Sequence, residues 1–166
     1  MPLPELRADC ARCAALCCVA LAFDRSSSFA FDKKAGEACR HLAPDNRCAV
    51  HDVRAGMSGC AAYDCLGAGQ RVVQELFGGS RVRSAAMFDA FRAMRLVHEL
   101  LLLLREAARL PLSRAQAAQR DALERALTPD AWTRASLSAF ERGLLPAEVR
   151  AFLRTLAPPG RVIARM

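Results

Sequence analysis

All eight cysteines of this 166-residue chain lie between residues 10 and 65, and four of them fall in the stretch "CARCAALCC" at 10–18. A chain of this length can form an apolar core without covalent crosslinks, so small size does not account for the thiols. The same segment is poor in regular patterns. Residues 19–24 and 29–32 alternate like short strands, while 43–48 and 55–60 have the composition of turns and loops. We therefore expect an irregular cysteine module that packing alone does not hold together.

Residues 9–18 can form one or two turns of helix. In a helix Cys10, Cys13 and Cys17 share one face, whereas Cys18 is rotated by about 100° from Cys17. Cys10 and Cys17 would then be separated by about 10 Å along the axis. One metal ion with thiolate bonds of about 2.3 Å does not comfortably take all three thiols of this face. We therefore expect the four early thiols to be divided between sites that later cysteines complete.

Metal binding is the interpretation that this inventory favours. Eight thiols make two four-thiolate sites or one multinuclear cluster, and the spacing does not decide between zinc and iron–sulfur. Metal binding would add to the folding free energy of a loop-rich segment. Redox chemistry and structural disulfides are the alternatives. The candidate ligands are Cys10, Cys13, Cys17, Cys18, Cys39, Cys48, Cys60 and Cys65, followed by His51 and His41, which neighbour cysteines in the sequence.

The cysteine pattern resembles the YkgJ family of cysteine-cluster proteins. The resemblance rests on CxxCxxxCC, on "CRHL" at 39–42, on "CAVHDVR" at 48–54 and on a closing pair, and it covers roughly residues 10–66. The family is described as zinc- or iron-chelating, which implies that the eight cysteines are ligands. His51 stands where the family usually has tyrosine, and Ala55 where it has proline. Similar modules begin some bacterial pentapeptide-repeat proteins, but no such repeat follows here.

From Gln70 onward the sequence predicts helices. "QRVVQELF" ends at the Gly78-Gly79 pair, and a long amphipathic pattern runs over 84–109. The Gly67-Ala-Gly69 stretch before these helices is interpreted as a flexible joint, and His98 as a structural residue. The fold class expected is mainly α, with an irregular metal-stabilised module at 1–69 packed on a bundle of about five helices at 70–166, as two units or as one compact domain.

Three further helices have recognisable ends. Ser113 and Gln116 have capping-box spacing before a helix. Thr128-Pro129 is predicted to cap and open a helix over "DAWTRASLSAFE", and Pro146 to open another. That last helix carries an apolar stripe and is predicted to end at 158–160; the stripe consists of Leu145, Val149, Phe152 and Leu156.

Charge separates the two halves. Residues 1–70 carry eight basic and eight acidic side chains, and residues 71–166 carry the net +7. The arginines of the second half are interleaved with acids and accompanied by few aromatics, so nucleic-acid binding is not expected and a protein partner is. The longest apolar run, 100–104, is too short for a membrane span, and no secretory signal precedes the module. We therefore expect a cytoplasmic protein.

The sequence leaves the biochemical role open among three classes. The first is a metal-binding protein. The second is an enzyme or enzyme subunit that uses the metal group in redox chemistry or in protein or peptide modification. The third is a thiol or metal sensor that regulates a partner. No catalytic pair of side chains is recognisable.

Overall fold

The computed structural model describes residues 4–50 and 56–156, and these are mainly helical, as predicted. Two short turns are not α-helical: η1 (Cys10–Arg12) is a 3₁₀ turn and η2 (Val72–Leu76) is a π-helical turn. The α-helices are α1 (Leu16–Ala20), α2 (Ser58–Ala62), α3 (Ala68–Arg71), α4 (Ala85–Ala107), α5 (Arg114–Leu127), α6 (Arg134–Arg142) and α7 (Leu145–Thr155).

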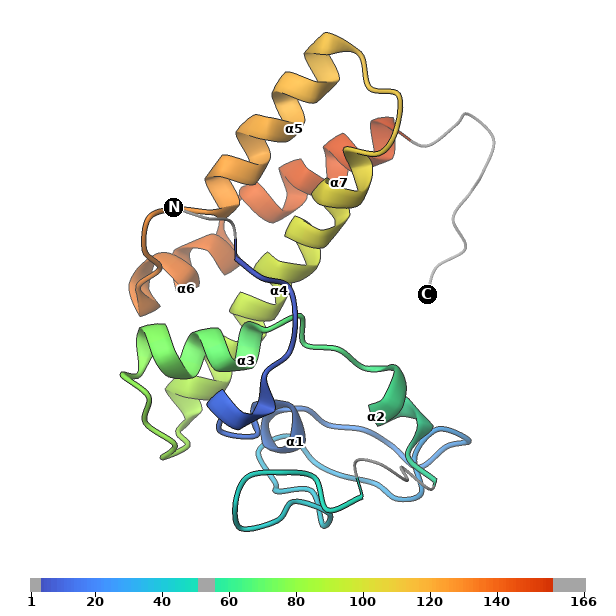
Figure 1. Ribbon diagram of the computed structural model, residues 1–166, viewed down its shortest axis with the longest axis vertical. Coiled ribbons are helices and arrows are strands. Elements are labelled where there is room, and N and C mark those ends of the chain that lie inside the picture. Colours follow the sequence, from blue (N-terminus) through green and yellow to red (C-terminus); the bar gives the residue numbers. More distant parts are fainter. Residues whose placement is uncertain (1–3, 51–55, 157–166) are drawn as a thin grey trace.

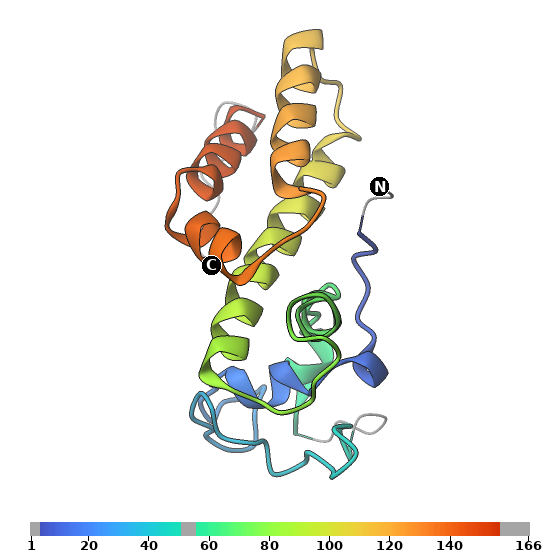
Figure 2. The same ribbon diagram turned by 90° about the vertical axis from the view of Figure 1, so that its left-hand side faces the viewer.

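Helix α4 is the central element of the fold. It packs against α1 and α3 toward its N-terminal end and against α5, α6 and α7 along the rest of its length. Figure 1 shows the cysteine-bearing loops at one end of α4 and the tip of α5 at the other. Figure 2 shows α5 and α7 beside the upper half of α4, and these two helices also pack against each other. The long helix therefore packs against both the cysteine module and the C-terminal helices.

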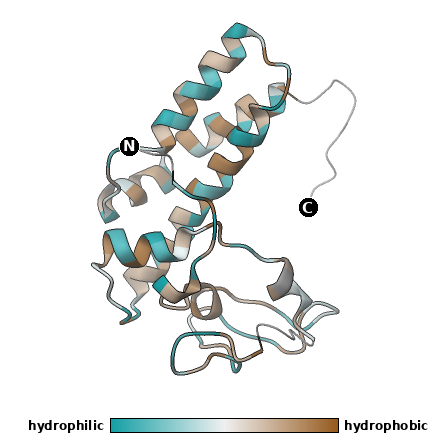
Figure 3. Cartoon of the chain, in the orientation of Figure 1, coloured by the Kyte–Doolittle hydropathy of each residue, from teal (hydrophilic) through white to brown (hydrophobic). Residues whose placement is uncertain are grey.

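One apolar cluster runs through the bundle into the inner edge of the module. From α4 it includes Phe91, Met94 and Leu101, and the C-terminal helices add Leu137 and Phe152. Each fully buried side chain of this size contributes about 1.5–3 kcal/mol relative to exposure. Figure 3 shows hydrophobic and hydrophilic residues alternating along α4 and α5, as amphipathic helices require. The same packing therefore holds the bundle and the nearest part of the module.

The helix ends agree with the sequence at one position and differ at another. The Ser113–Gln116 capping box is present, as predicted. The predicted start at Thr128-Pro129 is wrong, because α6 begins at Arg134 and its capping box is formed by Thr133 and Ser136. Thr128 instead terminates α5, where its Oγ1 donates to the Glu124 carbonyl at 2.8 Å. The reciprocal Thr133–Ser136 bonds satisfy two backbone donors, which a single Thr128 cap would not.

Helix α7 follows the predicted apolar stripe. It carries proline in its first turn, and Val149 and Phe152 are fully buried. The helix ends at Thr155, and the predicted stop at 158–160 lies outside the described residues.

The cysteine module contains less regular structure than the sequence suggests. The two short strands expected at 19–24 and 29–32 are wrong: the described part of the module holds only isolated bridges, at Phe23–Lys33 and Leu42–Cys48. The first two residues of the 19–24 stretch belong to helix α1, which ends at Ala20. Phe23, Phe29 and Phe31 form a small ring cluster beside the first bridge, with Phe23 and Phe29 stacked at 4.4 Å between centroids.

The one or two helical turns expected over 9–18 are present as two separate turns, η1 and the start of α1, and not as one continuous helix. The chain leaves η1 at Cys13 and passes through Ala15, whose φ of 55° is left-handed, before α1 starts. A non-glycine residue rarely adopts this conformation, and it interrupts any continuous helical face. Cys10, Cys13 and Cys17 are therefore not spaced along one axis.

Candidate metal centre

The structure places the eight cysteines in segments that are distant in sequence. Cys13 and Cys65 are buried, and Cys10 in η1 and Cys60 in α2 are exposed. The remaining four are half-buried, two of them in α1 and two in the loops that follow: Cys17, Cys18, Cys39 and Cys48.

Cys10, Cys13 and Cys65 influence one another near the start of α3, and Cys18 also acts on Cys10. Burial raises the pKa of Cys10, and the neighbouring Cys65 and Cys18 raise it further. Burial also raises the pKa of Cys13, and Cys65 and Cys10 add to the rise. The Cys13 Sγ lies so close to Gly69 that a Cβ there would meet it at 2.6 Å. Cys13 is thus held between η1 and α3, and Gly69 provides room for sulfur besides its predicted role as a joint.

Cys17 and Cys18 form a close thiol pair, with their Sγ atoms 3.9 Å apart. The hydrogen bond between them raises the pKa of Cys17 and lowers that of Cys18 to about 7. Lys33 and Arg83 lower the pKa of Cys18 as well, because positive charge favours the thiolate. Cys18 is therefore the member of the pair that loses its proton first.

The later thiols meet Cys18 through the loops. The Cys39 backbone N–H donates to the Cys18 carbonyl at 3.0 Å. The Leu42 N–H donates to the Cys39 carbonyl at 2.9 Å, and Leu42 forms the bridge to Cys48. Burial raises the pKa of Cys39, with Cys18 and Cys48 as further raising charges. Backbone pairing thus brings three distant cysteines into one neighbourhood.

Two thiols accept hydrogen bonds from backbone N–H groups that follow them in the sequence. Those of Leu16 and Ala15 lower the pKa of Cys13, against the larger effect of burial. The backbone N–H of His41 lowers the pKa of Cys39 in the same way, whereas burial raises it by more. Donors aimed at sulfur stabilise the thiolate, which is the form that binds metal. In metal sites, hydrogen bonds to the ligating side chains hold those side chains in the orientation that binds the metal.

Lys33 is the most unusual side chain near these thiols, since it is a lysine with only 5% of its surface exposed. Its Nζ donates to the carbonyls of Val19 at 3.1 Å, Lys34 at 3.1 Å and Glu37 at 2.9 Å. Burial lowers the pKa of Lys33, whereas Cys39 and Cys18 act to raise it. Three bonds satisfy an ammonium group fully, so the buried charge is compatible with the fold.

Arg83, which precedes α4, joins two cysteine-bearing segments. Its Nε donates to the Ala14 carbonyl at 2.9 Å, and its guanidinium also donates to the Asn46 side chain. Neighbouring side chains bind the same N-terminal segment: Gln74 donates to the Arg12 carbonyl at 2.9 Å, and Gln70 to the Arg7 carbonyl at 2.7 Å. The helical half thus fixes the backbone around the first thiols.

His98 supports the module from α4. It is buried, and its Nδ1 lies 2.6 Å from the Leu66 carbonyl, next to Cys65. Burial lowers the pKa of His98 to about 4, and the nearby Arg71 and Arg105 lower it too. A neutral ring therefore donates from Nδ1, and this agrees with the structural role that the sequence suggested.

The two secondary candidates have different outcomes. The His41 ring packs edge-on against Phe31 at 5.6 Å between centroids. The Arg40 guanidinium stacks on the Phe31 ring. His51 lies outside the described residues. Ligation by either histidine stays a prediction.

The donors fit a thiolate metal site in kind. Within residues 4–50 and 56–156, no three His, Cys, Asp or Glu side chains are yet close enough together to hold one ion. A metal ion that replaced the thiol protons would draw the sulfurs to ligand spacing. Coordination therefore requires side-chain and loop movements beyond the arrangement described here.

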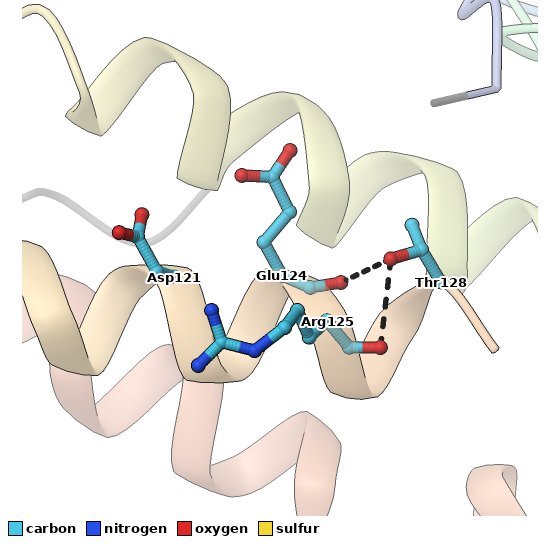
Figure 4. A pocket seen from close by; sticks show the side chains of 4 residues that line it. All are labelled: Asp121, Glu124, Arg125 and Thr128. Atoms are coloured by element: carbon cyan, nitrogen blue, oxygen red, sulfur yellow. Dashed lines mark hydrogen bonds between the residues drawn. The ribbon is translucent and has the colours of Figure 1, made fainter. Parts of the chain in front are cut away.

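A shallow pocket on α5 lies away from the cysteines. It measures about 170 Å³ and is lined by Asp121, Glu124, Arg125 and Thr128. Figure 4 shows the Thr128 hydroxyl bonded to backbone oxygens of α5. Glu124 pairs with Arg120 at 3.1 Å and with Arg105 at 3.5 Å. These partners account for its polar groups, and the pocket is interpreted as part of the α4–α5 packing.

Sequence reasoning missed Lys33, Arg83 and the Gly69 contact. Only Lys33 left a usable signal: 22 of the 24 basic residues are arginine, and the two lysines are adjacent at 33 and 34. A compact ammonium with three rotatable donors suits three converging carbonyls better than a planar guanidinium does. The other two contacts depend on residues about 40 to 70 positions apart in the chain.

Comparisons with known proteins identify one relative. The chain is 43% identical over 117 residues to the uncharacterized protein YybG of Bacillus subtilis (strain 168). The match covers 66% of this chain and 42% of the relative, so the chain spans less than half of that protein's length. No protein-family model and no solved structure matches. Among the described residues, no helix has the length and apolar character needed to cross a bilayer.

Proposed function

We propose that this chain is a metal-binding protein whose cysteine module holds zinc or iron–sulfur through thiolates. The observation that carries the proposal is the gathering of Cys10, Cys13, Cys17 and Cys65 near α3 and of Cys39 and Cys48 beside Cys18. A chain gains little by placing protonated thiols together, whereas a soft metal ion gains four strong bonds from them. The YkgJ resemblance supports the same ligand set.

The proposed metal has a structural task in this fold. Residues 22–62 contribute no member to the main apolar cluster, as far as the structure describes them. Their contacts include the three phenylalanine rings, the Lys33 bonds, the Arg83–Asn46 bond, the buried Met57 and several backbone hydrogen bonds. Thiolate–metal bonds would crosslink these loops to α1 and α3. Metal binding would thereby stabilise the segment that has the least packing of its own.

The test is metal analysis and a visible spectrum of the full chain isolated without oxygen. A colourless protein with about two zinc ions per chain supports closed zinc sites. A brown protein with absorption near ~400 nm supports iron–sulfur and gives weight to the alternative of a redox enzyme subunit. Cys60→Ser and Cys13→Ser should both lower the metal content. A chain that binds neither metal under reducing conditions contradicts the proposal.

The proposal also concerns compartment and partners. Thiolate ligands need a reducing environment, which favours the cytoplasm. A protein partner is proposed over nucleic acid because exposed apolar side chains lie beside the arginines; Leu144 is 76% and Val82 is 79% exposed. Regulation of such a partner by metal loss is the sensor alternative. Co-purification from metal-replete and chelator-treated cells tests it: a partner retained equally in both excludes metal-dependent regulation.

A further inference from the structure

Seven of the eight thiols fall into two groups with different surroundings; Cys60 on α2 is not assigned to either group. The first consists of Cys10, Cys13, Cys17 and Cys65, hereafter the core group. Cys13 and Cys65 belong to the main apolar cluster, and Cys17 packs against it. Cys10 joins them because the Cys13 N–H donates to its carbonyl at 3.3 Å and because Cys65 acts on its thiol. This group faces α3 and the N-terminal part of α4.

The second group consists of Cys18, Cys39 and Cys48, hereafter the loop group. Its members are tied by backbone bonds: Cys39 N–H to the Cys18 carbonyl at 3.0 Å, and Leu42 to both Cys39 and Cys48. All three are half-buried, and none belongs to the main apolar cluster. This group therefore depends on the loops, which open more readily than packed helices.

Helix α1 explains how adjacent cysteines enter different groups. Successive side chains on a helix are rotated by about 100°. Cys17 is thereby turned toward the apolar cluster, and Cys18 toward the loops and the two cations. The left-handed Ala15 residue sets the start of α1 and so fixes this direction. The 3.9 Å contact between the two sulfurs marks the boundary between the groups.

Positive charge lies beside the loop group. The Lys33 ammonium is held by Val19 on α1 and by Lys34 and Glu37 on the loop that leads to Cys39. Arg83 reaches Ala14 on one side and Asn46 on the other, between the segments that carry Cys18 and Cys48. Three thiolates around a divalent ion leave a net charge of about −1, which these cations offset.

We propose that the chain holds two separate metal ions: a slowly exchanging one in the core group and a readily exchanging one in the loop group, beside Lys33 and Arg83. The inference rests on the proposed metal-binding function and assigns its ligands. Release of the core ion requires α1, η1 and α3 to separate from the apolar cluster. The loop ion has three thiolates from this group, so its fourth position is supplied from outside the group, and such sites exchange ligands more easily.

Zinc release from the loaded full chain tests the division. In excess chromogenic chelator under reducing conditions, two zinc ions should leave in two phases whose rates differ at least about tenfold, which is about 1.4 kcal/mol in barrier. Cys39→Ser should abolish the fast phase and keep the slow one. Cys13→Ser should abolish the slow phase. Loss of the same phase in both variants, or one phase in the unaltered chain, overturns the division.

Because Cys13 is buried, its replacement can unfold the module, so a second measurement uses the unaltered chain. Loaded with cadmium-113, it should give two resonances without cadmium–cadmium coupling. Coupling between them would show a thiolate-bridged cluster across Cys17 and Cys18 and would overturn separate sites while leaving metal binding intact. A chain that takes up neither zinc nor cadmium overturns the proposed function together with this inference.

The adjacent lysines provide a matched pair for the charge argument. Lys33→Met removes the buried ammonium, and Lys34→Met removes the same charge from an exposed neighbour. Lys33→Met should accelerate the fast phase at least about fivefold and leave the slow phase unchanged. Lys34→Met should leave both phases unchanged. Equal effects of the two variants, or an effect of Lys33→Met on the slow phase alone, would contradict the assignment of Lys33 to the loop group.

Discussion

The helical bundle and the outer part of the cysteine module are stabilised in different ways. The bundle buries large apolar side chains on each of α4, α5, α6 and α7, including Leu104, Leu127, Leu137 and Val149. Over residues 22–62 the described contacts are mainly hydrogen bonds and ring packing around Phe31 and Lys33. The bundle is held together by apolar burial, whereas the outer part of the module has candidate ligands and its described residues contribute nothing to the main apolar cluster. This difference is the physical reason for proposing a metal in one region only.

The part of the module that contacts α4 is stabilised in the same way as the bundle. Cys13, Leu16 and Ala20 share the apolar cluster with α4. The boundary between the two kinds of stabilisation therefore lies just after α1, near residue 22, and not at the sequence position near residue 70 where the helical pattern begins. The predicted division at 69/70 stays a prediction for domains that fold independently.

The largest effect should come from the shared core. Phe91→Ala removes a fully buried ring of α4 and should cost about 3–5 kcal/mol, lowering the melting temperature of both regions together. Calorimetry with hydrogen exchange would measure this. Leu144→Ala, at a position 76% exposed, is the control and should change stability by less than about 0.5 kcal/mol. Loss of hydrogen-exchange protection in the module alone would contradict a core shared by the two regions.

Acid should weaken the junction through His98. Its pKa is lowered to about 4 in the fold, below its value of 6.5 when exposed. Between these values the unfolded chain binds a proton that the folded chain does not, so stability is full above pH 6.5 and falls as pH decreases toward 4. The loss is at most about 3 kcal/mol. Denaturant titrations at several pH values measure it.

His98→Gln is the control for this pH dependence, since it keeps a donor near the Leu66 carbonyl without the titrating ring. The variant should lose less stability between pH 6.5 and 4 than the unaltered chain. Identical slopes in the two proteins would show that other groups cause the acid sensitivity.

Gly69→Ala should strain the contact between α3 and Cys13, because the new Cβ would lie 2.6 Å from the Cys13 sulfur. The expected cost is about 1–3 kcal/mol. A double-mutant cycle isolates the contact: in a Cys13→Ala background the same substitution should cost much less. Additive effects of the two changes on the free energy of unfolding would show that Gly69 is required for another reason.

The smallest effect concerns the bundle alone. Thr133→Ala removes the side-chain cap of α6 and should cost about 1 kcal/mol, measured by chemical denaturation. Ser138→Ala, inside the same helix, should be neutral or slightly stabilising. A larger loss for Thr128→Ala than for Thr133→Ala would favour the start of the helix that the sequence alone predicted.

Much of the bundle was predictable because its signals are local. The Ser113–Gln116 box and the Val149–Phe152 stripe involve residues three apart, and both are present as predicted. Thr128 and Thr133 show the limit: both precede a plausible helix start, and the contact of Thr128 with Glu124 decides against the first. The module was less predictable because bridges such as Leu42–Cys48 depend on loop geometry rather than on periodicity.

The sequence by itself determined the helical bundle, the separation of thiols from net positive charge, and the inventory of candidate ligands. Only the tertiary structure decided which thiols are neighbours. The break at Ala15 removed the helical face on which a spacing argument for Cys10, Cys13 and Cys17 depends. The missing side chain of Gly69 leaves space for the Cys13 sulfur, and the buried Lys33 ammonium lies near Cys18 and Cys39. Helical periodicity is encoded by residues within a few positions of one another, whereas these contacts join residues that only the folded chain brings together.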